Sequence, residues 1–246
     1  PGLDPAPAQR LAVGPRVEAP VGIHLVRSAS GTSAPAPHRR HTIDGALHLR
    51  DVRAVGRGGP RPQRRPAPVD DAELLVVSVR RRTLPEIQLA KLHGFAGTLQ
   101  PIIALRTSSH AFALRNGEPP TGHAVWPGFD RDVLGGNYSN HHGNKLATYV
   151  KRHDSAKDHP ILADVTAEEF QVASSLYKTS PLTDSTTVLM TGRAEGVDRQ
   201  EPVAWTNDRD GQRIFYTSLG GPKEFEQKAF RTLLKNAIEW AIEEEE

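Results

Sequence analysis

The distribution of aromatic residues divides this chain into two unlike parts. All 14 Phe, Trp and Tyr residues lie after Asp70, whereas residues 1–70 hold 11 of the 20 prolines, 11 of the arginines and no lysine. A segment with many prolines and no aromatic side chain buries too little apolar area to offset the entropy of ordering it. We therefore expect residues 1–70 to be a low-complexity, Pro/Arg-rich segment that is disordered or atypical, and residues 71–246 to form the domain.

The arginines of residues 1–70 raise two further hypotheses. A nucleic-acid-binding arm is disfavoured, because the arginines are dispersed and no aromatic side chains are interleaved for base stacking. Translation of GC-rich DNA in another reading frame gives a similar composition, so the segment could also be non-native sequence. Its best apolar run, residues 21–26, is too short to form a core.

The composition of the whole chain excludes several classes of protein. There is no cysteine, which rules out disulfides, thiolate-bound metals and a cysteine nucleophile. No apolar run approaches the roughly 18 residues needed to cross a bilayer, and no signal peptide is visible. We expect a cytoplasmic protein with no membrane or nucleic-acid partner, and leave open whether it forms a homo-oligomer.

The first part of the domain has the pattern of a strand, a helix and a second strand. Ala72–Val79 and Pro101–Leu105 are continuous apolar runs of strand length, which are typical of strands buried on both faces of a parallel sheet. Thr83 is the expected N-cap of the helix, Pro85 fits its first turn and Gly97 its end. Its expected buried stripe is Ile87, Leu89, Ala90, Leu92 and Phe95.

The second part of the domain adds strands and a final helix. Thr187–Met190, Pro202–Thr206 and Arg213–Ser218 are predicted strands, and the last two flank an Asp-Gly turn that predicts an antiparallel hairpin. The final helix is expected near Pro222. Its predicted buried stripe is Phe230, Leu233, Leu234, Ala237, Ile238 and Ala241.

The turn after Leu105 is the first candidate site, because open α/β sheets bind ligands where strands end and helices begin. It contains Arg106, Ser108, Ser109 and His110. Adjacent residues in a helix point in different directions, which disfavours a Ser-His hydrolase here. We expect a capping serine and a His110 that faces the pocket or a backbone carbonyl. Arg106 would bind a ligand rather than attack it, or else form a structural ion pair.

The polar loop at residues 134–144 is the second candidate site. Its glycines allow close approach to a ligand, its asparagines both donate and accept hydrogen bonds, and Tyr138 could stack on a sugar. A metal site involving His110 and one of the neighbouring histidines His141 and His142 is a rival hypothesis. Histidines that are simply hydrogen-bonded within an ordered loop are a third. Trp126 and Phe129 are expected to anchor this loop, and at least one of Arg80, Arg81 and Arg82 should face the same crevice.

Six segments carry a resemblance to a known family, in that family's order. They are ALRTSSHAF at Ala104–Phe112, LGGNYSNHHGN at Leu134–Asn144, DHPIL at Asp158–Leu162, SLYK at Ser175–Lys178, EPVAWT at Glu201–Thr206 and RIFYTSLGGPKEF at Arg213–Phe225. Together they resemble the ThuA-like (trehalose utilisation) family. The resemblance implies a class I glutamine amidotransferase-like, flavodoxin-like fold: a three-layer α/β domain whose sheet is mainly parallel, with a late antiparallel hairpin.

The resemblance also implies a carbohydrate or sugar derivative as the ligand. His110 and His142 are then the candidate acid–base residues, for chemistry on an oxidised sugar. Arg106, Ser109, Asn137, Tyr138, His141 and Lys178 are the candidate substrate-binding residues, and no metal or other cofactor is expected. Arg106 stands where amidotransferases carry a nucleophilic cysteine, and Gly221 stands where similar members have a histidine. These departures favour the alternative of a non-catalytic binding or interaction module, so whether the chain is an enzyme stays open.

Overall fold

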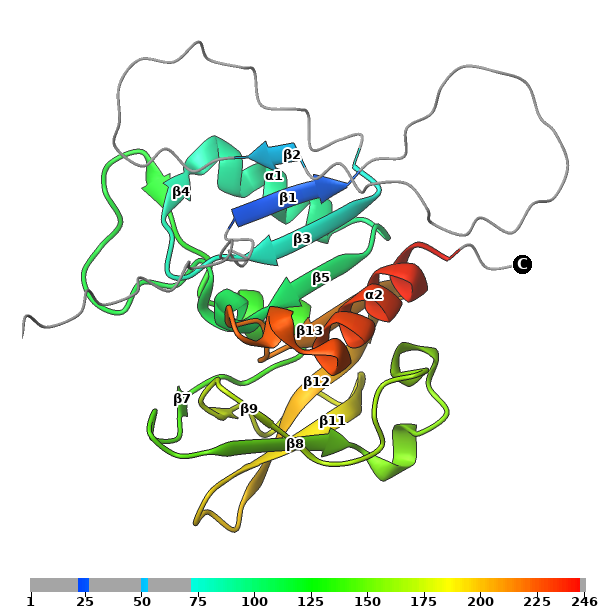
Figure 1. Cartoon of the computed structure of the whole chain (residues 1–246). Helices are drawn as coiled ribbons and strands as arrows, with labels where there is room; N and C mark the ends of the chain where they lie inside the picture. Colours follow the sequence, from blue (N-terminus) through cyan, green and yellow to red (C-terminus); the bar gives the residue numbers. More distant parts are fainter. Residues whose placement is uncertain (1–21, 27–49, 53–71, 244–246) are drawn as a thin grey trace, which may run out of the picture.

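A mixed nine-stranded sheet organises the chain, and helices α1 and α2 lie on its two faces (Figure 1). The computed structural model describes residues 22–26, 50–52 and 72–243. The strand order is β2-β1-β3-β5-β13-β12-β11-β8-β9. The strands of this sheet are β1 (Gly22–Val26), β2 (Arg50–Val52), β3 (Leu74–Ser78), β5 (Ile102–Leu105), β8 (Thr148–Arg152), β9 (Phe170–Val172), β11 (Thr186–Ala194), β12 (Gln200–Arg209) and β13 (Gln212–Thr217).

Besides the large sheet, the described chain forms two small sheets, two α-helices and several short helical turns. Two small ribbons pair β4 (Leu84–Pro85) with β6 (His123–Ala124) and β7 (Asn140–His141) with β10 (Tyr177–Lys178). The helices are α1 (Glu86–Ala96) and α2 (Lys228–Ile242). The short helical turns are η2 (Arg106–His110), η3 (Asp130–Leu134), η4 (Asp154–Ala156), η5 (Pro160–Leu162) and η6 (Glu224–Glu226).

Three parallel strands form the middle of the sheet. β5 pairs in parallel with β3 on one side and with β13 on the other, and Ile102 aligns with both Leu75 and Ile214. The predicted parallel pairing of the first two strands is therefore confirmed. The predicted hairpin is confirmed as β12 and β13, which pair antiparallel.

The expectation of a mainly parallel sheet is wrong. Every other neighbouring pair of strands in the sheet is antiparallel. The reason lies partly in short connections, which can join only antiparallel strands. The turn between β12 and β13, for example, places Asp210 and Gly211 at φ values of 53° and 87°. The fold is α/β, with a large mixed sheet and few helices.

Residues 1–70 contribute more to the sheet than their composition predicted. β1 pairs antiparallel with β3 from Gly22 opposite Ser78 to Val26 opposite Leu74, and β2 pairs with β1. The expectation that this segment is disordered therefore does not hold for residues 22–26 and 50–52. A strand from this segment inside the sheet also counts against the hypothesis that the segment is non-native sequence. The predicted disorder of the remaining residues lies outside the described part of the chain.

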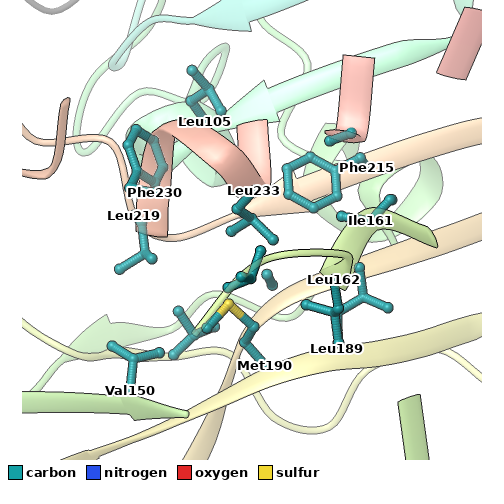
Figure 2. Close-up of a cluster of buried hydrophobic side chains, with 14 of the residues drawn as sticks. Leu105, Val150, Ile161, Leu162, Leu189, Met190, Phe215, Leu219, Phe230 and Leu233 are labelled. Carbon is teal, nitrogen blue, oxygen red and sulfur yellow. The ribbon is translucent and has the colours of Figure 1, made fainter. Parts of the chain in front are cut away.

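The sheet separates two clusters of buried apolar side chains. Leu75 and Val77 of β3 pack on the α1 face, whereas Leu74 and Val76 pack on the α2 face, as the alternation of a strand requires. Figure 2 shows the second cluster, in which Leu105 and Phe215 of the sheet lie close to Phe230 and Leu233 of α2. The central parallel strands are thus covered by a helix on each face. The candidate site lies where these strands end.

Both long helices differ slightly from their predictions. α1 begins after Pro85, with no side-chain cap from Thr83, and Ile87 is 76% exposed rather than part of the buried stripe. Pro222 does not start the last helix, because η6 lies between it and α2. The predicted stripe of α2 is confirmed, since Phe230, Leu233, Ala237 and Ala241 are buried and Leu234 and Ile238 pack at their margin. Within the described ranges, no helix combines the length and apolarity needed to cross a membrane.

Candidate functional site

A cavity of about 570 Å³ lies at the carboxyl ends of β3 and β5. This is the position at which open α/β sheets commonly bind ligands, because the loops that follow neighbouring parallel strands diverge there. Its lining combines guanidinium groups, aromatic rings, side-chain amides and hydroxyls. The described residues that line it are Arg80, Arg81, Arg106, Thr107, His110, Arg115, Tyr138, Ser139, Asn140, His141, Asn144, Ser175 and Tyr177.

Arg106 occupies a strained turn directly after β5. Its φ of 47° lies in the left-handed region, which residues with a Cβ rarely adopt. The Tyr216 hydroxyl donates to its carbonyl oxygen at 2.7 Å, and its own guanidinium donates to the Ser218 carbonyl at 3.1 Å. The guanidinium carbon also lies 5.1 Å from the centre of the Tyr177 ring. The sequence placed Arg106 at a sharp turn facing the crevice, and the structure has it there.

Arg81 repeats this geometry at the end of the neighbouring strand. Its φ is 48°, and its amide donates to the His110 carbonyl oxygen at 3.1 Å. The side chain lines the cavity, and its Nε atom is buried without a hydrogen-bond partner among the described residues. Arg80 also lines the cavity, whereas Arg82 does not. The expectation that at least one of the three faces the crevice therefore agrees with the geometry.

His110 links the first cavity to a second one of about 240 Å³. The ring is only 7% exposed and stacks on Tyr138, with ring centroids 4.6 Å apart. Burial, followed by the charges of Arg81, Arg80, Arg106 and Arg115, lowers the pKa of His110 to about 4. The imidazole is therefore neutral near pH 7 and offers one donor and one acceptor.

The predicted separation of Ser109 from His110 is wrong. The Ser109 hydroxyl and His110 Nδ1 share a hydrogen bond of 3.1 Å. The 3₁₀ geometry of η2 is the local difference from the α-helix that was assumed. Ser109 is buried and borders the second cavity. Ser108 binds backbone carbonyls of Val77 and Leu105 instead, and in this way ties the turn to both strands.

The loop at residues 134–144 forms one wall of the site. The predicted aromatic anchors hold it: Phe129 is 2% exposed, and Trp126 donates its amide to the Phe112 carbonyl. Tyr138 borders both cavities, and His141 borders the larger one. Asn137 is exposed and borders only the smaller cavity.

Two predicted site residues lie outside both cavities. Tyr177 and Lys178 are adjacent in β10, and successive side chains in a strand point to opposite faces. Tyr177 lines the larger cavity, and the exposed Lys178 lines neither. His142 follows β7 and also lines neither, although its amide donates to the Leu176 carbonyl. The expectation that Lys178 shares the pocket with His110 is therefore wrong, and of the two neighbouring histidines it is His141, not His142, that lines it.

Asp130 is a member of the site that sequence reasoning missed. It begins the π-helical turn η3, is 7% exposed, and borders the smaller cavity. Oδ2 accepts the Tyr138 amide at 2.7 Å, whereas Oδ1 is buried without a partner among the described residues. Burial raises the pKa of Asp130 to about 7. Its sole sequence signal is its place next to the anchor Phe129, which says nothing about burial.

Gly221 stands beside a buried carboxylate. A Cβ added at this glycine would lie 2.5 Å from Glu224 Oε2 and 2.9 Å from Ser174 Oγ. Glu224 is 1% exposed, and its Oε1 accepts the Ser174 amide at 2.8 Å. Glu224 therefore fills the space that a side chain at position 221 would need.

In the described part of the chain, no three His, Cys, Asp or Glu side chains are grouped so as to hold a metal ion.

The chain is similar to known proteins in sequence and in fold. The family model of ThuA, trehalose utilisation, matches residues 120–241. The chain belongs to the ThuA-like family. A solved ThuA-like protein from Bacteroides uniformis ATCC 8492 is 15% identical, with a TM-score of 0.52, over 70% of this chain and 69% of that one. At that identity, the likeness shows that the ThuA-like fold is shared.

A second solved ThuA-like protein, from Parabacteroides merdae ATCC 43184, is 18% identical, with a TM-score of 0.49. The match covers 70% of this ThuA-like chain and 71% of that one. No curated protein matches the chain. The residues matched by the ThuA family model begin after β3, β5 and η2, so they include the Tyr138 wall of the site but neither Arg81, Arg106 nor His110.

Proposed function

We propose that this ThuA-like chain binds a carbohydrate or sugar derivative in the larger cavity. The observation that carries the proposal is an aromatic cluster on the cavity wall: the Tyr138 ring lies 4.7 Å from Tyr177 and 4.6 Å from His110. Such rings offer apolar faces with polar edges, which suits the mixed surface of a sugar. Asn140 and Asn144, which line the same cavity, supply amides that can both donate to and accept from hydroxyls.

The buried polar groups favour acid–base chemistry on an oxidised sugar. Asp130, with a pKa of about 7, can take up and release a proton near pH 7, and a neutral His110 can donate or accept a hydrogen bond beside it. The two groups border the same smaller cavity and both contact Tyr138, since the His110 ring stacks on its ring and Asp130 accepts its amide. The pair suits removal and return of a proton next to a keto group. His142 and Lys178, which lie outside the cavities, have no part in this proposal.

A second candidate is a non-catalytic binding module on a class I glutamine amidotransferase-like, flavodoxin-like scaffold. The observation that favours it is Arg106 itself. Its backbone has the strained turn of a nucleophile, but a guanidinium stays protonated and cannot attack a carbonyl group. Gly221, packed against Glu224, favours it as well.

Titration calorimetry against monosaccharides, disaccharides and their keto forms tests the sugar proposal. We expect at least one of these to bind the wild-type chain and to bind the Tyr138→Ala variant about tenfold more weakly. Tyr149→Ala is the matched control, because Tyr149 is half-buried in β8 and lines neither cavity. If no sugar binds, or if both variants lose affinity equally, the proposal fails. Product analysis of a bound keto sugar then separates the catalytic candidate from the binding module.

A further inference from the structure

The larger cavity holds positive charge that no described acidic group neutralises. Arg80, Arg81, Arg106 and Arg115 all line it, and no Asp or Glu is among its described lining residues. None of the four forms an ion pair with a carboxylate of the described ranges, where the ion pairs involve other arginines and lysines. Arginine does not lose its proton in proteins, so these charges persist at any physiological pH.

The four guanidinium groups act on the interior of the site as well as facing solvent. All four act on His110, which is 7% exposed, and each of them lowers its pKa. Because His110 and the four guanidinium groups line the same cavity, the field of these charges reaches into it. A ligand in the cavity experiences the same field.

The backbone holds two of the four arginines in matching positions. Arg81 and Arg106 follow the parallel neighbours β3 and β5, and both have left-handed φ values, 48° and 47°. Such conformations in non-glycine residues cost energy and persist where the surrounding structure over-determines them. The Arg106 guanidinium is further fixed by Ser218 and Tyr177. The pair is therefore preorganised before any ligand arrives.

A missing acceptor is visible at Arg81. Its Nε atom is buried and has no partner among the described residues, although buried donors in folded proteins almost always have one. If the ligand were uncharged, the four guanidinium groups that line its binding site would have no negative charge to pair with. An anionic oxygen would satisfy both the donor and the charge, in the bidentate geometry that guanidinium groups favour.

We infer that Arg81 and Arg106, supported by Arg80 and Arg115, form an anion subsite that binds the carboxylate or phosphate of a sugar derivative. The sugar part of this inference rests on the function proposed above. The anion part does not, because it depends on the arginines alone. None of the four arginines falls within the residues matched by the ThuA family model, so that match assigns nothing to them.

The test compares neutral and anionic probes on the full chain. Calorimetry at neutral pH and low salt, in a buffer without phosphate, measures binding of glucose, glucuronate, a hexose phosphate and inorganic phosphate. We expect glucuronate or the hexose phosphate to bind about tenfold to a hundredfold more tightly than glucose. The preference between these two identifies the anion as carboxylate or phosphate. Added salt should weaken the anionic probes and leave glucose unchanged.

Charge-matched variants locate the effect. Arg81→Gln removes one cavity charge, whereas Arg82→Gln removes the next charge along the chain, which is exposed and lines neither cavity. Arg81→Gln should bring the affinity for the anionic probe close to that for glucose, and Arg82→Gln should leave it unchanged. Circular dichroism and a thermal melt of each variant show whether the fold is kept. Arg115→Gln, at an exposed position, serves as the second test if Arg81→Gln does not fold.

The outcomes separate this inference from the sugar proposal. If inorganic phosphate binds and Arg81→Gln abolishes its binding while no sugar binds, the anion subsite stands and the sugar proposal fails. If glucose binds as tightly as its anionic derivatives, the anion subsite is refuted and the sugar proposal stands. If no probe binds, or if Arg82→Gln and Arg81→Gln weaken anion binding equally, the anion subsite is refuted.

Discussion

The hydroxyl of Tyr216 donates a hydrogen bond of 2.7 Å to the carbonyl oxygen of Arg106. Tyr216 is fully buried in β13, and burial raises its pKa well above the ordinary value, so the hydroxyl keeps its proton. Arg106 begins η2 in a left-handed conformation. A core residue of the neighbouring strand thus holds the peptide that aims Arg106 into the cavity.

We expect Tyr216→Phe to destabilise the protein and to weaken ligand binding together. The change leaves a buried carbonyl oxygen without its donor, which lowers the free energy of unfolding by about 1–3 kcal/mol. It also loosens the turn that orients Arg106. Urea unfolding and calorimetry measure the two effects. Tyr149→Phe is the control, since Tyr149 is not part of the site, and equal losses in both variants would contradict the role given to Tyr216.

Arg106→Gly and Arg106→Ala should bind ligand equally poorly but differ in stability. Both lose the guanidinium, which weakens ligand binding by about 2 kcal/mol for a charge-assisted hydrogen bond. Alanine keeps the left-handed strain and glycine does not, so we expect the glycine variant to be more stable by about 1 kcal/mol. Chemical denaturation measures the difference. An alanine variant as stable as the glycine variant would show that the turn carries no strain.

Asp130 should make the folded state less stable as pH rises. Its pKa is raised from 3.8 to about 7 on folding, so the folded chain binds the proton more tightly. The resulting stabilisation is present below pH 3.8 and is lost as pH rises through about 7. The Asp130→Asn variant does not lose this stabilisation. Between pH 3.8 and about 7, its free energy of unfolding should therefore rise relative to that of the wild type by up to roughly 4 kcal/mol. Asp132→Asn, at an exposed position in the same turn, is the matched control for the loss of a carboxylate, and equal trends in the two variants would contradict the role given to Asp130.

His110 has the opposite pH dependence over nearly the same range. Its pKa falls from 6.5 to about 4, so its contribution to stability is present above pH 6.5 and is lost as pH falls towards 4. In the wild type, the slopes from His110 and Asp130 therefore offset each other. The stability of Asp130→Asn should rise with pH across this range. Unfolding curves at several pH values check this, and a flat profile in the variant would contradict the low pKa of His110.

Gly221→His should be destabilising by about 1–3 kcal/mol, because its new Cβ would meet Glu224 and Ser174. Glu224→Ala in the same chain should relieve the clash, so the double variant should lose less stability than the sum of the two single changes. A double-mutant cycle of unfolding free energies measures this coupling. Additive losses would show that Glu224 does not occupy the space of a side chain at position 221.

The central strands were predictable because they are buried on both faces. Continuous apolar runs such as Ala72–Val79 record that burial directly in the sequence, and the two strands were placed correctly as parallel neighbours. Residues 22–26 were seen as an apolar run but judged too short for a core. Strand β1 needs no core of its own, because β3 supplies its hydrogen-bonding partner. Local sequence does not show such a partner.

The site was predictable where the end of a strand fixes it. Arg106 and His110 follow β5 at once, so their place in the crevice comes from the parallel sheet alone. Lys178 was misplaced because the side that a residue faces in a two-residue ribbon depends on pairing with a distant segment. Asp130 was missed because its burial and raised pKa depend on packing that joins η3 to the Tyr138 loop. The contact between Ser109 and His110 depends on the kind of helix, which two adjacent residues do not reveal.

Strand β13 lies between β5 and β12, at the centre of the sheet (Figure 1). The strands on one side of it are β5, β3, β1 and β2, and those on the other side are β12, β11, β8 and β9. Among the described strands, only β13 pairs with both groups. Its pairing with β5 joins residues separated by more than a hundred positions, for example Ile102 and Ile214. During synthesis, the sheet therefore stays in two pieces until β13 has left the ribosome. The turn at Arg106 waits for the same event, since Tyr216 and Ser218 arrive with β13. A ligand of this cavity would recognise only molecules in which β13 has joined the sheet, and its binding would report that this strand is in place.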